Sequence, residues 1–181
     1  MKRIIFILFI SVGVAKGQQL IHEERSSQIQ VAIFMAVDCP ITQKYLNTIK
    51  EVANQYAGKS VQFVGYFPVG LSKKESMAFR DEYKIPKSIE LIDDKKHEWT
   101  EMLNAKVTPE VFVIKNKQVL YRGAIDNWFY ELGRYRKKVT AHYLVDAIQA
   151  SLNNEKPSIT ETEALGCFIQ RSERTESHPH H

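Results

Sequence analysis

Apolar positions along this chain follow two different spacings, which predicts a mixture of strands and helices. Residues 29–37 (IQVAIFMAV) are almost continuously apolar and rich in β-branched side chains, so they predict a strand covered on both faces. From Ile41 to Gly58 apolar residues recur at helical spacing, and Pro40 stands in the expected first turn. Residues 61–67 (VQFVGYF) predict a second strand. Strand, helix and strand in this order form a βαβ unit, which favours a parallel pair with a right-handed crossover.

Shorter elements are expected in the middle of the chain. Ser72 and Glu75 form a capping box, which predicts a helix that runs to about Tyr83. A short strand is predicted over 89–92 and a short helix over 97–104.

A hairpin and a final helix are predicted beyond these elements. Residues 110–114 and 119–122 read as two strands joined by a turn. The stretch 124–139 is expected to be an irregular loop, and Thr140 is expected to cap the last helix. The apolar face of that helix comprises Leu144, Val145, Ile148 and Leu152.

The first 17 residues have the pattern of a signal peptide. Lys2 and Arg3 precede an apolar run over 4–15, which as a helix would span roughly 18 Å, short of the ~30 Å hydrocarbon core. Small residues before Gln18 predict cleavage there. We therefore expect an exported protein, periplasmic or extracellular, without stable membrane insertion after cleavage. Residues 18–28 are expected to form a lead-in, and 171–181 a disordered tail.

Composition narrows the class of protein further. The chain has 181 residues, of which 44% are hydrophobic and 25% are charged, which fits one domain with a sizeable core and excludes disordered and collagen-like proteins. The net charge is +4, but three basic residues lie in the predicted leader, so the remainder is close to neutral. This balance gives no reason to expect a nucleic-acid partner.

Only two cysteines occur, Cys39 and Cys167, so a scaffold with several disulfides and a four-cysteine zinc site are both excluded. One disulfide, two separate thiols or a redox pair remain. Cys39 lies where the first strand meets the following helix, and free N–H groups at a helix N-terminus stabilise a thiolate. It is therefore a candidate nucleophile, with a buried structural thiol as the alternative.

Four motifs in order carry a resemblance: AVDCPIT after the first strand, VTPEVFVI before the hairpin, VLYRGAID after it, and GCFI near the end. With them the chain resembles the thioredoxin-like superfamily, and within it the redoxin or peroxiredoxin-like (AhpC/TSA-related) branch. The resemblance implies an α/β fold over 29–153, with a central mixed sheet of four to five strands and helices on both faces. It places Cys39 at the redox position, Thr108 before a cis Pro109, and Cys167 in an extension over 154–170.

Two positions depart from these families. Thr42 stands where thioredoxins carry their second cysteine, and Ala36 stands where peroxiredoxins carry a threonine. By the same resemblance, Arg122 would supply a positive charge near the thiolate. Relatives that end in Gly-Cys-x-Ile suggest that Cys167 belongs to the fold as the second thiol.

These observations predict a thiol–disulfide oxidoreductase in which Cys39 attacks and Cys167 resolves, without a cofactor. Its partners would be protein thiols or disulfides, or small peroxide or thiol substrates. The residues expected to shape the site are Pro40, Thr42, Thr108, Pro109 and Arg122.

Two alternatives remain open. One is a thioredoxin-fold module that is non-catalytic or binds a soft metal such as copper through Cys39, Cys167 and His142; the other is a weak thiol peroxidase. Trp99 and Trp128 are expected to fill core or loop contacts, and Asp126 either orients the 124–139 loop or lies near the site.

Overall fold

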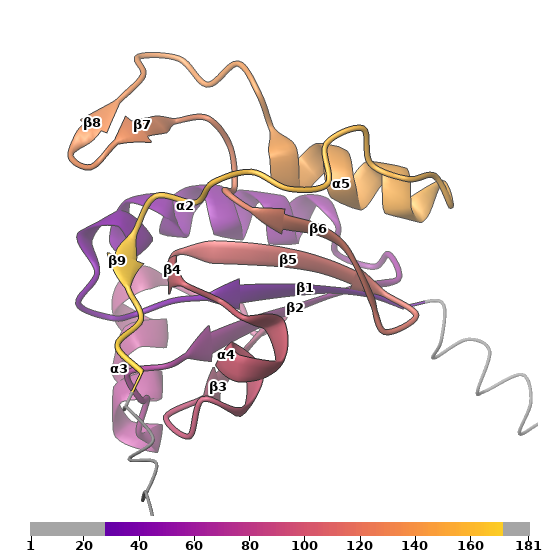
Figure 1. The fold of residues 1–181 in the computed structure, drawn as a ribbon. Helices are drawn as coiled ribbons and strands as arrows, with labels where there is room; N and C mark the ends of the chain where they lie inside the picture. The colour runs from indigo at the N-terminus through magenta and orange to yellow at the C-terminus, as the bar shows by residue number, and fades with distance from the viewer. Residues whose placement is uncertain (1–27, 172–181) are drawn as a thin grey trace, which may run out of the picture.

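A five-stranded mixed sheet forms the centre of the computed structural model, which describes residues 28–171 (Figure 1). Its strands lie in the order β3-β2-β1-β5-β6. The central strand β1 is parallel to β2 and antiparallel to β5. The strands are β1 (Ile29–Phe34), β2 (Val61–Phe67), β3 (Ile89–Asp93), β5 (Glu110–Lys115) and β6 (Gln118–Gly123).

Helices cover both faces of the sheet, as the sequence predicts. Val31 and Ile33 of β1 belong to the larger core cluster, together with buried residues of three helices. Ala32 and Phe34 point to the other face and pack in a second cluster with Trp99. This alternation lets one continuous apolar strand serve two cores. The helices are α2 (Pro40–Gln55), α3 (Lys73–Tyr83) and α5 (Tyr143–Leu152) on the first face and α4 (Glu98–Leu103) on the second.

The segment predicted to be an irregular loop contains a small hairpin. Its strands are β7 (Phe129–Glu131) and β8 (Arg134–Tyr135). Tyr45 of α2 packs on the rings of Trp128 and Phe129, so contacts with α2 fix this hairpin above the helix.

The expected cap of the last helix was also wrong. His142 is the N-cap of α5, whereas the backbone N–H of Thr140 donates to the Asn127 side chain at 3.0 Å. Asn127 therefore ties Thr140 to the preceding loop before the helix begins.

A two-stranded ladder that the sequence did not predict joins distant parts of the chain. The strand β4 (Val107–Thr108) pairs antiparallel with β9 (Cys167–Phe168). After α5 the chain returns along β6, where the N–H of Thr162 donates to the Arg122 carbonyl at 3.0 Å. This return path, which crosses the sheet edge in Figure 1, brings the C-terminal segment to β4.

The predicted signal peptide over 1–17 and all but the first residue of the predicted 171–181 tail lie outside the described residues. Within 28–171, no helix has the length and apolar content needed to cross a membrane.

Asp94 holds the start of α4, the helix that leads into β4. Its buried carboxylate accepts hydrogen bonds from the backbone N–H groups of Trp99 and Thr100 at 3.0 and 2.9 Å, and from the Thr100 hydroxyl at 2.6 Å. These bonds satisfy donors at the helix N-terminus that would otherwise lack partners.

We expect Asp94→Ala to lower the free energy of unfolding by about 1–3 kcal/mol, because it leaves buried donors without an acceptor. Urea denaturation followed by circular dichroism measures this change. Asp81→Ala, which removes an exposed carboxylate from α3, serves as the control. Equal stability of the two variants would contradict this role for Asp94.

Candidate functional site

Cys39 occupies the N-cap of α2, and residues 35–38 connect it to the central strand β1. Its backbone is extended, with φ −80° and ψ 113°, and Pro40 begins the helix. The Cys39 carbonyl accepts the N–H of Gln43 at 3.0 Å, which is the first bond of the helix. The Cys39 side chain is only 2% exposed. Cys39, the nucleophile predicted from the sequence, thus lies at the positive end of the helix dipole but is buried.

Thr108, the last residue of β4, faces Cys39. The Cys39 thiol donates a hydrogen bond to the Thr108 carbonyl at 3.0 Å, and the Thr108–Pro109 peptide bond is cis, as the resemblance implies.

Cys167 is the third residue of the site, beside Cys39 and Thr108. In the β4–β9 ladder Cys167 is the register partner of Thr108, whose carbonyl accepts from Cys39, and both cysteines line the same cavity. Both cysteines are free thiols. The structure therefore brings together the two cysteines that the sequence singled out.

The pKa values of the two thiols shift in opposite directions. Burial raises the pKa of Cys39, but hydrogen bonds from the Cys167 side chain, the Thr42 backbone N–H and the hydroxyls of Thr108 and Thr42 outweigh burial and lower it overall. Burial, the hydrogen bond to Cys39 and the negative charges of Cys39 and Asp38 raise the pKa of Cys167 to about 12. Of the two thiols, Cys39 therefore loses its proton more readily than Cys167.

The Thr42 hydroxyl gains a hydrogen-bond acceptor when Cys39 becomes a thiolate. With Cys39 as a thiol, the buried Thr42 Oγ1 atom has no hydrogen-bond partner. Among residues 28–171 it is the one buried side-chain nitrogen or oxygen in this situation. A buried polar group without a partner costs about 1–3 kcal/mol. Once Cys39 ionises, its sulfur becomes a strong acceptor for this hydroxyl. Thr42 thus favours the charged form of Cys39.

A cavity of about 450 Å³ opens beside the two cysteines. Sequence reasoning missed two residues in its wall, Lys95 and His97. The His97 Nε2 atom lies 2.9 Å from the Pro68 carbonyl, to which it can only donate. Pro68 follows β2 and His97 follows β3, and the carboxyl ends of parallel strands meet at one edge of a sheet. This rule was the signal in the sequence that could have identified Pro68 and His97 as neighbours at the site. The residues that line the cavity are Ala36, Asp38, Cys39, Pro68, Val69, Lys95, His97, Thr108, Cys167, Phe168, Ile169 and Gln170.

Arg122 does not line this cavity. Its guanidinium pairs with Glu110 and Glu161, each at 3.5 Å, and lies over the ring of Phe112. The structure thus places the expected positive charge among carboxylates rather than beside the thiolate.

The three candidate copper ligands are not brought together. His142 is exposed at the start of α5, and the part of the chain that the structure describes contains no group of three potential metal ligands.

The remaining candidate residues have structural contacts. Trp99 packs on Tyr66, and Trp128 packs on Tyr45. Asp126 is buried and accepts hydrogen bonds from the Tyr45 hydroxyl at 2.7 Å and from the backbone N–H of Trp128 at 2.8 Å. Asp126 therefore anchors the loop before β7 to α2.

The order of the sheet, the cysteine at the start of α2 and the cis-proline before β5 decide the fold. The fold is thioredoxin-like. No family model matches the sequence, and no curated protein does.

Solved structures do match. A hypothetical protein from Sinorhizobium meliloti 1021 has a TM-score of 0.69 at 19% identity, covering 84% of this chain and 85% of its own. An uncharacterized conserved protein from Geobacillus kaustophilus has a TM-score of 0.67 at 19% identity, covering 84% and 82%. StoA from Bacillus subtilis is more distant, with a TM-score of 0.47 at 16% identity, covering 72% and 84%. At these identities the likeness concerns the fold alone.

We expect the rate of Cys39 alkylation to rise with a midpoint below the ordinary thiol pKa of about 8.5. Thr42→Val should move this midpoint to higher pH without destabilising the fold, because it removes a hydroxyl that has no partner in the thiol state. Iodoacetamide labelling against pH, followed by mass spectrometry, measures both values.

Thr42→Ser keeps the hydroxyl and is the matched control, with a midpoint near that of the unchanged chain. A Thr42→Val midpoint that does not move would show that this hydroxyl does not stabilise the thiolate.

Proposed function

We propose that this protein is a thiol–disulfide oxidoreductase that uses Cys39 as the nucleophile and Cys167 as the resolving cysteine. The observation that carries the proposal is the placement of both cysteines at Thr108 on one cavity, and the lowered pKa of Cys39 and raised pKa of Cys167 support it. Pro40, Thr42, Thr108 and Pro109 shape the surroundings of Cys39 in this proposal.

The reaction begins when the Cys39 thiolate attacks one sulfur of a partner disulfide. A bond forms between Cys39 and that sulfur, the partner S–S bond breaks, and the other sulfur leaves as a thiolate. Cys167 then loses its proton and attacks the sulfur of Cys39. The first partner sulfur leaves as a thiolate, and the Cys39–Cys167 disulfide remains. The partner has gained two electrons, and the reverse sequence would oxidise a partner dithiol.

Loss of its proton is the demanding step for Cys167. The negative charge on Cys39 is one cause of the raised pKa of Cys167. When Cys39 enters a mixed disulfide this charge disappears, so the Cys167 thiol becomes easier to ionise. The order of attack is therefore built into the electrostatics of the pair.

An oxidising compartment suits this chemistry, and the leader-like pattern over 1–17 supports export to the periplasm or the extracellular space. Protein thiols or disulfides are the partners that we propose.

In the oxidised protein we expect a reversible Cys39–Cys167 disulfide within one chain. Non-reducing peptide mapping and mass analysis after graded oxidation detect it, and glutathione or dithiothreitol should reduce it. Cys39→Ser and Cys167→Ser should each retain one thiol and form no such bond. Two free thiols in the oxidised chain, or only dimers joined through Cys39, would remove Cys167 from the resolving role.

Turnover of hydrogen peroxide should be poor. Ala36 lines the Cys39 cavity and offers no hydroxyl to a bound peroxide, and the loss of one such donor typically costs about 10²–10³ in rate. Peroxide consumption by the reduced chain, with Cys39→Ser as the background, measures this. A rate like that of a dedicated peroxidase would place the protein among peroxidases instead.

A further inference from the structure

The C-terminal strand β9 lies against β4 as an added strand, with alternate side chains on opposite sides. Ile169 is 9% exposed and packs in the second core cluster, and Cys167 is partly buried opposite Thr108. Phe168, between them, is 81% exposed. This alternation is what an extended segment bound to a sheet edge shows: backbone pairing holds it, and every second side chain enters the protein.

Gly166 is required by the approach of two backbones. A Cβ atom at this position would lie 2.2 Å from the Thr108 carbonyl oxygen and 2.6 Å from its carbon. Both are main-chain atoms, so no side-chain rotation would relieve the clash. Only glycine therefore fits directly before the cysteine that faces Cys39.

Ile169 anchors the segment on the other side of the cysteine. Its side chain belongs to the second core cluster, with Phe34 and Phe112 of the sheet. Its backbone N–H donates to the Lys106 carbonyl at 2.9 Å. The pattern Gly-Cys-x-Ile thus describes a small residue, a reacting sulfur, an open position and an apolar anchor.

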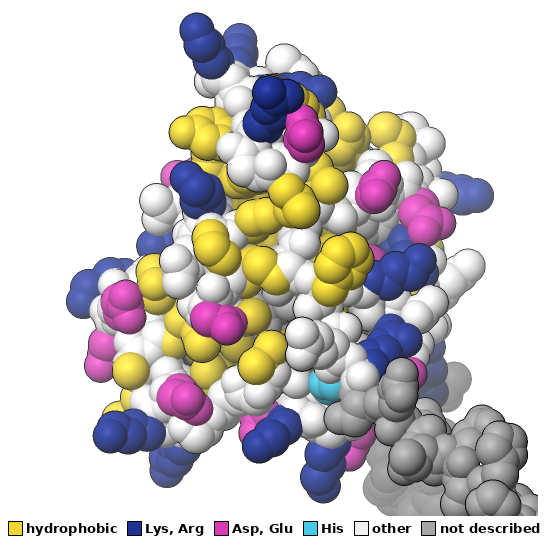
Figure 2. All heavy atoms as spheres, turned by 60° about the vertical axis from the view of Figure 1, so that its left-hand side comes forward, with side chains coloured by type: hydrophobic (Ala, Val, Ile, Leu, Met, Phe, Trp, Pro, Cys, Tyr) yellow, Lys and Arg dark blue, Asp and Glu magenta, His cyan; other side chains and the backbone are white. Residues whose placement is uncertain are grey.

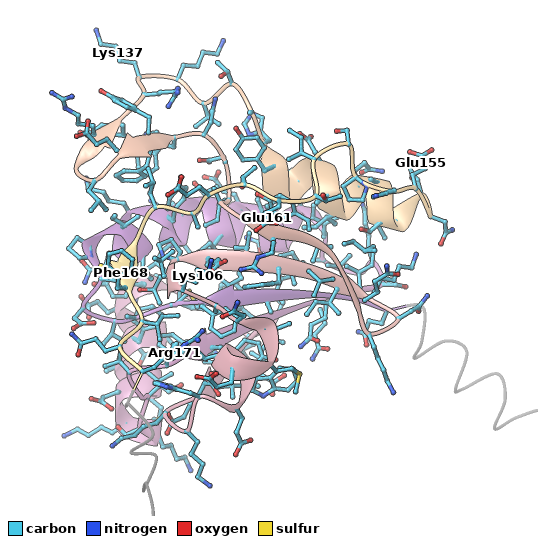
Figure 3. The ribbon with its side chains drawn as sticks, in the orientation of Figure 1. Lys106, Lys137, Glu155, Glu161, Phe168 and Arg171 are labelled. Carbon is cyan, nitrogen blue, oxygen red and sulfur yellow. The ribbon has the colours of Figure 1, made fainter. Side chains whose placement is uncertain are left out.

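The attachment of β9 is local. Beyond Ile169, the Arg171 guanidinium donates to the Ala105 carbonyl at 2.8 Å and to the Asn104 side chain at 3.1 Å, and both are exposed or partly buried bonds. Figure 3 shows Phe168 and Arg171 along this last stretch of the described chain, with Arg171 beside the end of α4. So short a strand can detach without disturbing the main sheet.

We propose that β4 is the docking edge for an extended cysteine-bearing segment of a partner protein, and that β9 holds this edge until the partner displaces it. The inference rests on the proposed function of Cys39. The occupant that the site selects has glycine before its cysteine and a branched aliphatic residue two positions after it, as β9 itself has. Its cysteine takes the place of Cys167 opposite Thr108.

The surface around this edge suits a protein rather than a small molecule. Figure 2 shows hydrophobic side chains gathered across this side of the molecule, with lysines and arginines around the margin. Among the exposed apolar residues outside β9, Val69 lines the Cys39 cavity, and Leu132 lines the next one beside Gly166. Exposed apolar patches of this kind are typical of interaction sites.

The covalent step is the exchange described above, with the partner disulfide as the oxidant. The Cys39 thiolate bonds to the docked cysteine sulfur, and the second sulfur of the partner leaves as a thiolate. When β9 returns to β4, Cys167 attacks Cys39 and releases the docked cysteine as a thiolate. Since β4 can pair with one strand at this register, the return of β9 also removes the partner from its docking edge.

The test uses the reduced Cys167→Ser chain, in which Cys39 is the one remaining thiol. End-blocked tetrapeptides carry their cysteine as a mixed disulfide with thionitrobenzoate, so each transfer to Cys39 releases a coloured thiolate. The matched pair is Gly-Cys-Phe-Ser and Gly-Cys-Ser-Ile, which lose the anchor or the exposed ring respectively. Val-Cys-Phe-Ile tests the glycine, and intact mass identifies the adduct on Cys39.

Gly-Cys-Phe-Ser and Val-Cys-Phe-Ile should react about tenfold or more slowly than Gly-Cys-Phe-Ile, because the first loses a buried aliphatic anchor and the second clashes with Thr108. Gly-Cys-Ser-Ile should stay within about threefold, since its changed side chain faces solvent. Ile169→Asp in the same chain should speed the reaction of Gly-Cys-Phe-Ile, because β9 then competes less well for β4.

Equal rates for the matched pair, in a chain whose Cys39 still reacts, would overturn strand docking and leave the proposed function standing. Reaction with dithionitrobenzoate alone, and with none of the peptides, would have the same meaning. A Cys39 that reacts with neither, even in the Ile169→Asp chain, would overturn the proposed function together with this inference.

Discussion

The pairing of β4 with β9 is the contact on which the whole site depends. It holds the segment beside Cys39, which is 2% exposed, and it places Cys167 where its side chain lowers the pKa of Cys39 more than any other group does. Burial alone would disfavour a thiolate. The strand that excludes water therefore also provides the donor that compensates for the loss of water, and Gly166 permits the close approach that both effects need.

The elements that place Cys39 could be predicted from the sequence because their signals are long and local. The strand over 29–34 and the helix after Pro40 have enough residues to show a period, and a cysteine between them must stand at a helix N-terminus. The cis bond before Pro109 is different, because only about 5–6% of such bonds are cis in folded proteins. It was expected from the resemblance of the surrounding motif, and the structure has it.

Other features depend on contacts that no local pattern records. The strand β9 has two residues, too few to show a period, and Thr108 and Cys167 are separated by 59 positions. The position of Arg122 depends on Glu161, a residue of the returning linker. The β7–β8 hairpin owes its place to aromatic contacts with Tyr45 of α2. In each case a partner distant in sequence decided between structures that the local sequence allows equally well.

A reactive thiol that is buried must be exposed at the moment of reaction, and the sizes of the two associations at Cys39 show how this can occur. Cys39 is held in position by β1 and α2, the two elements on either side of it in the chain, and both are long and packed in the main core. The cover above it is a short strand with one buried aliphatic side chain and a few backbone bonds. Burial of one such side chain is worth only about 1.5–3 kcal/mol, whereas the sheet opens only with the domain. Detachment of β9 is therefore the low-energy opening of this site. It removes the cover and the main hydrogen-bond donor together, so Cys39 is best stabilised as a thiolate when it is least accessible. A partner strand that pairs with β4 as β9 did would place its own sulfur beside Cys39 at the moment when Cys39 is uncovered.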